Sequence, residues 1–268
     1  MVNGNGASAQ QQPKPLLEWL NLIVTEPFYA FHMLAFFSYG VVRTSTSQFL
    51  SPHFAPHLLH REIQAVLAFS FLVAIKLVKE DTWEAFVADL LFYAKLFLVA
   101  ISSLLDYHLA ILYVLVFSVM YVISQQPAFR GLGASSKLTP LQLEALLTEG
   151  NTSRFWLVEF RALSSPDCVR VSRCLPELSI TYSNKNLSFG IVDLGLFPNA
   201  AAKFGVSLSG SLSQLPTYIL FENAAEVTRF PEVKSEEKPS HPSPTKRLLA
   251  RHFELDRLLL AYVNGKWD

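Results

Sequence analysis

The 268-residue chain is 51% hydrophobic and only 16% charged, with a mean hydropathy of +0.29. A soluble domain carries about 25% charged residues, so we expect part of this chain to lie in a membrane. The lipid bilayer is therefore an expected partner of the protein. The 22 acidic and 22 basic residues balance, and no basic run is interleaved with aromatic residues, which argues against nucleic acid as a partner. Two cysteines are too few for a disulfide framework or a four-cysteine zinc site, and the sequence predicts neither a metal nor a cofactor.

The first 126 residues are predicted to form a disordered tail followed by a transmembrane region. Residues 1–15 are polar and of low complexity, and they lack the basic start and adjacent apolar stretch of a cleavable signal peptide. Residues 16–126 are repeatedly apolar, and their clearest segment, 107–124, contains no full charge. Eighteen helical residues rise about 27 Å, close to the thickness of the hydrocarbon core. Tyr107 and Tyr121 lie near the two ends of this segment, as in an aromatic belt, so we expect it to span the membrane.

Three weaker apolar segments precede this one, so the sequence predicts two to four spans: 28–42, 63–78 and 84–105. The last of them contains Asp89 and Lys95, which are six residues apart and therefore do not share a helix face. Charges within a membrane segment can mark a transport path. They also occur in a tilted or interfacial helix whose charges face a neighbouring helix or the headgroups, and we favour this second interpretation.

The expected orientation rests on basic residues close to the clearest segment. Arg130 and Lys137 follow it, whereas the short loop before it carries neither lysine nor arginine. Because basic residues favour the cytosolic side, the C-terminal half is predicted to face the cytosol. Glycosylation sequons begin at Asn151 and Asn186, and they would be used only if that half were luminal.

The remainder of the chain, 137–268, has the composition of a soluble domain with alternating helices and strands. The elements are predicted in the order helix 137–150, strand 154–160, a helix through 182, strand 187–194, helix 198–206, strands 215–223 and 226–230, and helix 248–263. Residues 232–247, rich in charge and proline, are predicted to form a flexible loop before the last helix. Such alternation predicts a small α/β domain.

The only two cysteines lie in the stretch SSPDCVRVSRCLPEL, 164–178. If Cys168 and Cys174 share one helix, they are about 9 Å apart along its axis. A disulfide needs Cα atoms within roughly 7 Å, so we expect no bridge between them.

The order of these elements carries a resemblance to a known family. The strand ending in VEF leads into a cysteine-bearing helix start, VDL ends the next strand, and LPT opens the hairpin, so that 137–263 resembles the thioredoxin fold. Together with the membrane segments, the runs SSPDC, LSFGIVDLG and SQLPTYILF resemble the thioredoxin-related transmembrane protein 2 family, of which this chain looks like a divergent homologue. The resemblance implies residence in the endoplasmic reticulum membrane, possible contacts with mitochondria, and a role in redox homeostasis and protein folding like that of protein disulfide isomerase-related proteins.

The resemblance also places the redox motif. Where thioredoxins have Trp-Cys-Gly-Pro-Cys, this chain has Ser164-Ser165-Pro166-Asp167-Cys168, so Ser165 stands at the attacking position and Cys168 at the resolving position. A serine hydroxyl cannot form the mixed disulfide through which dithiols react. Efficient disulfide exchange is therefore not expected. Two alternatives remain for Cys168, a slow monothiol or redox-sensing role and an inert structural role.

Two further site residues come from the same resemblance. Glu159 corresponds to the buried acid that moves protons in thioredoxins, although a strand acid paired with a nearby base is an equally good interpretation. Pro216 corresponds to the cis-proline beside the active cysteine, where a groove for client peptides can persist without the chemistry, or where the proline is kept only for folding. Arg161 replaces a tryptophan of the family, and Cys174 matches no redox position and is expected to be half-buried. We favour a non-catalytic binding module for client or regulatory proteins over a redox enzyme that acts through Cys168.

Overall fold

The computed structural model describes residues 25–46, 54–148, 154–208, 215–232 and 243–265. The predicted tail, the sequon at Asn151 and most of the predicted loop 232–247 lie outside these ranges. Packing divides the chain into two compact units, Met1–Val66 with Lys95–Gln125, and Leu67–Ala94 with Gln126–Asp268. The predicted domain boundary at 137 stays a prediction.

The first unit consists of apolar helices. It contains α2 (Pro27–Thr46), the first half of α3 (Phe54–Lys79), the second half of α4 (Trp83–Leu105) and α5 (Tyr107–Ile123). Its core is formed by Ala35, Leu98, Tyr113 and Phe117. The Tyr113 hydroxyl shares a 2.9 Å hydrogen bond with Ser38, which ties α5 to α2.

One helix of the described chain, α4, is long and apolar enough to cross a bilayer. The segment that the sequence marks as clearest, α5, is apolar but has only 17 residues, because Asp106 caps its start and the helix ends at Ile123. Helix α3 has 26 residues and carries several charges, and like α2 it does not meet the same criteria of length and hydropathy. The expected count of two to four spans is therefore not confirmed.

The second unit contains a five-stranded mixed sheet in the order β1-β3-β2-β4-β5. The strands are β1 (Ser136–Lys137), β2 (Phe155–Arg161), β3 (Leu187–Asp193), β4 (Thr217–Glu222) and β5 (Ala225–Phe230). Strands β1, β3 and β2 are parallel, whereas β4 and β5 run antiparallel as a hairpin. Every residue of β2 is buried, including Glu159 and Arg161, which agrees with the buried strand predicted here and with its central place in the sheet. This sheet confirms the α/β architecture expected from the sequence.

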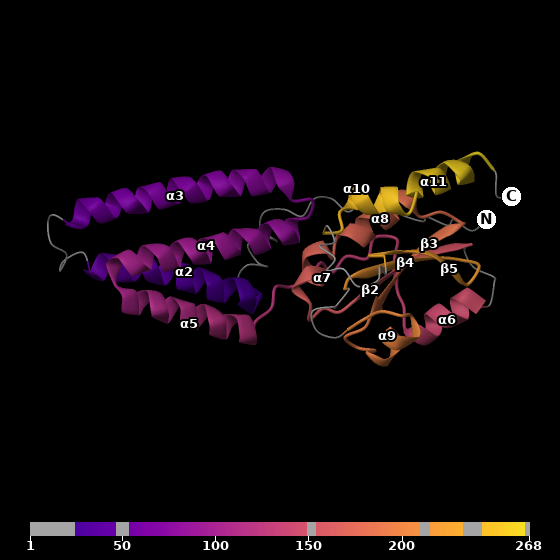
Figure 1. The fold of residues 1–268 in the computed structure, drawn as a ribbon, viewed down its shortest axis with the longest axis horizontal. Coiled ribbons are helices and arrows are strands. Elements are labelled where there is room, and N and C mark those ends of the chain that lie inside the picture. The colour runs from indigo at the N-terminus through magenta and orange to yellow at the C-terminus, as the bar shows by residue number, and fades with distance from the viewer. Residues whose placement is uncertain (1–24, 47–53, 149–153, 209–214, 233–242, 266–268) are drawn as a thin grey trace, which may run out of the picture. The chain divides into compact units, whose positions relative to one another are not determined.

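Helices cover both faces of the sheet (Figure 1). On one face α6 (Pro140–Thr148) and α9 (Asn199–Lys203) pack over Trp156, Val158 and Phe160 of β2. On the other face α8 (Cys174–Tyr182), α10 (Lys246–His252) and α11 (Leu255–Val263) pack over Phe155 and Leu157. Residues of β2 alternate between the two apolar cores, as side chains of a strand must.

Two helices predicted as continuous are broken. The expected helix through 182 consists of α7 (Pro166–Val171) and α8, separated by Ser172 and Arg173, and the last helix breaks at Glu254, whose φ is +50°. Cys168 and Cys174 therefore lie on different helices, and the 9 Å separation derived for a single helix does not apply to them. Both are free cysteines.

Candidate functional site

The Ser165–Cys168 motif lies at the carboxyl end of the central strand. Strand β2 ends at Arg161, the Ser165 amide donates to the Ala162 carbonyl at 3.0 Å to close a tight turn, and α7 begins at Pro166. Ser165 has an extended backbone and occupies the N-cap, while proline suits the first helical position because its missing N–H would have no partner there. The local sequence thus fixes both the turn and the start of the helix.

Cys168 is the third residue of α7 and is completely buried. Burial raises the pKa of its thiol to about 11, and hydrogen bonds with the Ala162 backbone and the Ser165 side chain offset this only in part. Cys174 is also fully buried rather than half-buried as expected, and burial raises the pKa of its thiol to about 12. Both thiols are therefore protonated at neutral pH, and neither matches the exposed, low-pKa thiol of a redox site.

Glu159 lies fully buried on β2, with Ile191 of β3 and Tyr218 of β4 as its neighbours across the sheet. Burial raises the pKa of its carboxyl group to about 7, and the nearby Arg161 guanidinium lowers it only in part. Arg161 is itself buried, and its Nη1 lies 4.0 Å from the Glu159 Oε2. The geometry therefore combines a raised carboxyl pKa with a basic neighbour, so it agrees with both interpretations given for this acid.

Tyr218 belongs to the same buried polar group and was not anticipated. It is fully buried directly opposite Glu159, and burial together with that carboxyl group raises the pKa of its hydroxyl. The register of β4 against β2 places Tyr218 on the same face as Glu159, and the two-residue alternation of β4 alone does not supply that register.

Pro216 lies at the same end of the sheet as the motif. The Leu215–Pro216 peptide bond is cis, and Thr217, the next residue, lies opposite Phe160 near the end of β2. Most of the segment expected to form the rim of a groove, 207–214, lies outside the described residues.

Exposed apolar side chains follow the ends of two parallel strands near this motif. The Leu194 amide donates to the Arg161 carbonyl at 2.7 Å, which keeps the chain leaving β3 beside the chain leaving β2. Leu163 is 42% exposed just after β2, and Leu196 is 73% exposed just after β3. Neither was singled out in the sequence, where a lone leucine after a strand resembles any core residue.

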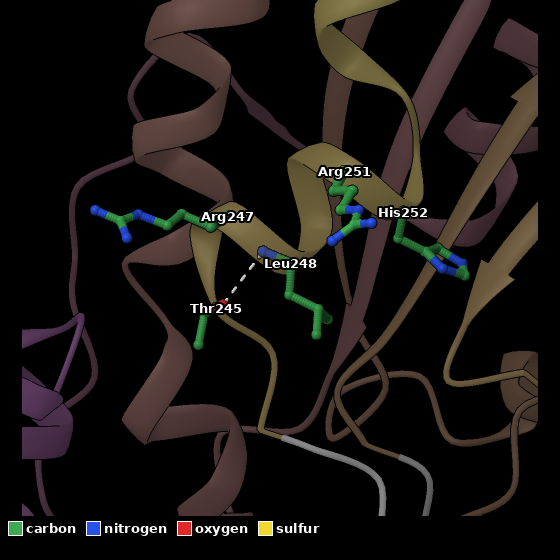
Figure 2. Close-up of a pocket in the computed structure, with 5 residues that line it drawn as sticks. All are labelled: Thr245, Arg247, Leu248, Arg251 and His252. Atoms are coloured by element: carbon green, nitrogen blue, oxygen red, sulfur yellow. Dashed lines mark hydrogen bonds between the residues drawn. The ribbon is translucent and has the colours of Figure 1, made fainter.

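A separate open pocket of about 540 Å³ lies on α10 (Figure 2). It is lined by Thr245, Arg247, Leu248, Arg251 and His252. The Thr245 hydroxyl accepts a hydrogen bond from the Leu248 amide at 3.2 Å, which caps the helix. Because the lining contains no thiol and no carboxylate, this pocket supplies no redox group.

The two charged residues of the membrane segment have defined neighbours. Asp89 forms ion pairs with Lys76 at 2.5 Å and with Arg170 at 2.7 Å. The Lys95 ammonium lies 5.7 Å from the centre of the Phe117 ring. These contacts support the interpretation in which the charges face neighbouring side chains. Within the described ranges, no three histidine, cysteine or acidic side chains gather in a way that could hold a metal ion.

Among solved structures, the chain is similar to thioredoxins, including the following two. Reduced thioredoxin pre-protein of Schistosoma mansoni aligns with 36% of this chain and 84% of its own, at 26% identity and a TM-score of 0.31. Thioredoxin Mala s 13 of Malassezia sympodialis aligns with 39% of this chain and 84% of its own, at 15% identity and a TM-score of 0.31. No protein-family model matches the chain.

Sequence relatives extend the similarity to the membrane segments. Over 201 residues the chain is 29% identical to thioredoxin-related transmembrane protein 2 of Xenopus laevis, which covers 75% of this chain and 69% of the relative. Over 228 residues it is 27% identical to the Drosophila melanogaster homolog of that protein, which covers 81% of this chain and 83% of the relative. With its N-terminal apolar helices and a mixed-sheet, thioredoxin-like domain, the chain is a divergent homologue of thioredoxin-related transmembrane protein 2.

Proposed function

We propose that this protein is a membrane-anchored, thioredoxin-like binding module that does not exchange disulfides efficiently. One observation carries the proposal: Cys168 is fully buried, with its thiol pKa raised to about 11. The resemblance to thioredoxins supports it, since it puts Ser165 at the position of the attacking cysteine. At pH 7 such a thiol is ionised in roughly one molecule in ten thousand. Because the thiolate is the nucleophile of disulfide exchange, Cys168 is both inaccessible and in its unreactive form.

The surface for binding is proposed at the carboxyl end of β2 and β3. Leu163 and Leu196 expose apolar surface there, and cis-Pro216 lies at the same sheet end. Exposed apolar side chains beside a turn whose chemistry is lost favour contact with a client or regulatory protein over catalysis.

The proposed location is the endoplasmic reticulum membrane, at contacts with mitochondria, with the thioredoxin-like domain in the cytosol and a role in redox homeostasis and protein folding. The names of the relatives support a membrane, and the basic residues Arg130 and Lys137 support the orientation. A glycosylation tag fused after Asp268 tests the orientation. An unmodified tag in cells is expected, and a glycosylated tag would overturn the cytosolic assignment.

The alkylation rate of Cys168 as a function of pH tests the central proposal. The full-length protein with Cys174→Ser is reconstituted in lipid nanodiscs, and iodoacetamide labelling is followed by mass spectrometry. We expect slow labelling up to about pH 10 and rapid labelling once denaturant unfolds the chain, as burial requires. Rapid labelling of the folded protein, with an apparent pKa below the ordinary value of about 8.5 and glutathione trapped on the sulfur, would instead establish a monothiol redox role.

A further inference from the structure

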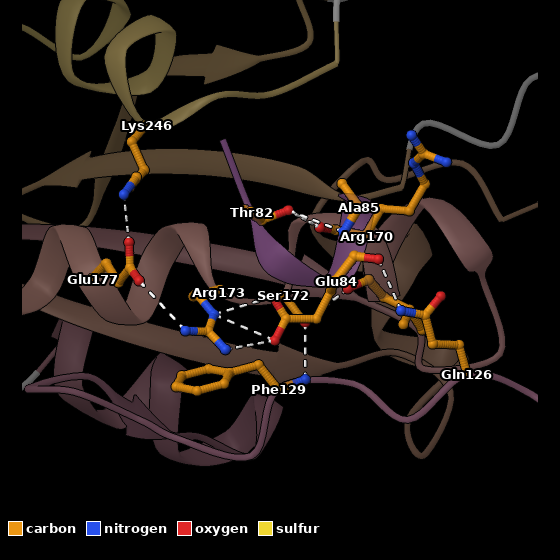
Figure 3. Close-up of polar contacts among 11 residues, drawn as sticks. Thr82, Glu84, Ala85, Gln126, Phe129, Arg170, Ser172, Arg173, Glu177 and Lys246 are labelled. Carbon is orange, nitrogen blue, oxygen red and sulfur yellow. Dashed lines mark hydrogen bonds and ion pairs between the residues drawn. The ribbon is translucent and has the colours of Figure 1, made fainter. Parts of the chain in front are cut away.

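Part of the membrane-proximal chain packs directly on the helix that carries Cys168. Residues Leu67–Ala94, which include the end of α3 and the start of α4, belong to the same compact unit as the thioredoxin-like domain. Their side chains reach residues 170–173, the end of α7 and the turn that follows it, which we call the elbow (Figure 3). The elbow begins two residues after Cys168.

The strongest contact joins Arg173 of the elbow to Glu84 in the first turn of α4. Arg173 Nη2 donates to Glu84 Oε1 at 2.8 Å and Nε donates to Oε2 at 3.1 Å, a two-pronged pairing of a planar guanidinium with a carboxylate. The Glu84 side chain is only 10% exposed. The Arg173 guanidinium also lies 4.4 Å from the centre of the Phe129 ring, so it is held by charge and by stacking together.

Arg170 is held at both its side chain and its backbone. Its Nη1 donates to Asp89 Oδ1 at 2.7 Å, and its carbonyl accepts a hydrogen bond from the Thr82 hydroxyl at 2.6 Å. That carbonyl belongs to the last turn of α7, where backbone oxygens have no partner within the helix. The same Thr82 oxygen accepts from the Ala85 amide at 3.3 Å at the start of α4. One side chain therefore links the start of α4 to the end of α7.

The elbow is fixed from its opposite side as well. The Phe129 amide donates to the hydroxyl of fully buried Ser172 at 3.0 Å, and this hydroxyl donates to the Val169 carbonyl at 2.7 Å. Gln126, in the segment leading to Phe129, donates to the Glu84 backbone carbonyl at 2.8 Å. Segments that precede and follow α5 in the sequence therefore both contact the elbow. Helix α7 itself has only six residues, so it contributes few hydrogen bonds of its own.

We propose that the contacts of Thr82, Glu84 and Asp89 with the elbow form a clasp. Through this clasp the membrane-proximal chain holds α7 in place, so that Cys168 on this helix stays buried. A six-residue helix is not stable by itself, so its position depends on the contacts at its ends. Opening the clasp frees the end of α7 and gives solvent access to the thiol. This inference rests on the proposed function, since it explains how Cys168 is kept out of solvent.

The test compares alkylation rates of Cys168 in full-length protein in nanodiscs, in the Cys174→Ser background. Arg173→Glu and Glu84→Arg each place like charges together in a partly buried site, and each is expected to raise the rate about tenfold or more, as for a lost charged hydrogen bond. The exchanged pair Glu84→Arg with Arg173→Glu restores an ion pair and is expected to return the rate to within about threefold of the parent.

A matched control comes from Arg154, whose pair with Glu222 at 2.7 Å lies at the other end of β2. Arg154→Glu breaks an ion pair in the same unit, and it is expected to leave the alkylation rate unchanged. Hydrogen exchange of peptide 166–173 supplies a second readout, with faster exchange expected in Arg173→Glu and parental exchange in the exchanged pair.

The outcomes separate this inference from the proposed function. A parent protein that already labels rapidly overturns the proposed function. A protected parent whose Arg173→Glu and Glu84→Arg variants label as slowly as it does overturns the clasp alone. Equal acceleration by Arg154→Glu, or no rescue by the exchanged pair, assigns the effect to general loss of stability and also overturns the clasp.

Discussion

The two faces of the sheet differ in what they bury. Under α6 and α9 the sheet presents apolar side chains such as Val158 and Phe160, whereas under α7 and α8 it presents Glu159, Arg161 and Tyr218 beside both cysteines. An apolar core needs only volume and shape, but a buried acid and a buried arginine cost solvation free energy that stability alone does not require. This second face also packs apolar side chains such as Phe155 and Leu157, and we call it the polar face only because it buries Glu159, Arg161 and Tyr218 as well. The apolar face shows what the fold itself needs.

The largest effect is expected on the apolar face. Phe160 is fully buried there, and Phe160→Ala should lower the free energy of unfolding of the thioredoxin-like domain by about 4 kcal/mol, through lost transfer free energy and a cavity. Denaturant unfolding followed by tryptophan fluorescence measures this. Exposed Leu196→Ala is the control and should change the free energy by less than about 0.5 kcal/mol. A similar effect of both substitutions would contradict the assignment of the core.

On the polar face, Glu159 should make stability depend on pH. Its pKa is about 7 in the folded protein and near its ordinary value of 4.5 when unfolded, because burial favours the neutral acid. A raised pKa contributes stability that is fully present below about 4.5 and is lost as the pH rises through about 7. The loss amounts to about 3 kcal/mol.

Glu159→Gln should remove this dependence and make the domain more stable than its parent at pH 8. Unfolding free energies at pH 4.5 and pH 8 measure the difference. Because Arg161 and Tyr218 face the same carboxyl group, Arg161→Met is the informative companion. Without the cation the carboxyl pKa should rise further, so that the loss of stability extends to higher pH. An identical pH dependence in parent and Glu159→Gln would contradict the role given to this carboxyl group.

Adding a thiol at position 165, where the resemblance to thioredoxins places the attacking cysteine, should sharpen the contrast between the two faces. Ser165→Cys creates a Cys-Pro-Asp-Cys turn at the start of α7 and is expected to raise the rate of insulin disulfide reduction at least about tenfold over the parent. Ser164→Cys is the matched control, since it adds a thiol one residue out of register and should add little activity. Activity that persists in Ser165→Cys with Cys168→Ser would show that Cys168 is not the resolving thiol.

The smallest expected effect concerns Cys174. Its Sγ lies 3.8 Å from the Pro244 carbonyl in a fully buried position. Cys174→Ser adds a hydroxyl that can donate to the same carbonyl, so the free energy of unfolding should fall by only about 1 kcal/mol. The labelling rate of Cys168 should not change. A large increase in that rate would mean that the two helices α7 and α8 depend on the Cys174 thiol for their packing.

Local patterns account for the parts of the fold that the sequence predicts. Strands β2 and β3 and the β4–β5 hairpin follow from residue type and spacing, and the resemblance points to Ser165 and Cys168. The α7–α8 break and the contact of Glu84 with Arg173 follow from no local pattern, because the two partners are 89 residues apart in sequence. The burial of Cys174 likewise depends on α10, which the sequence does not place against it.

The ion pairs of Asp89 also limit how α4 can meet a bilayer. With Asp89 held by Lys76 and Arg170 of the thioredoxin-like unit, at most Leu90–Leu105, which still includes Lys95, is left for hydrocarbon, and these residues rise about 24 Å. That length is about 3 Å shorter than the hydrocarbon thickness of an endoplasmic reticulum membrane and about 8 Å shorter than that of a plasma membrane. Hydrophobic mismatch therefore disfavours this helix in thick bilayers, and a thin membrane is the one it fits best.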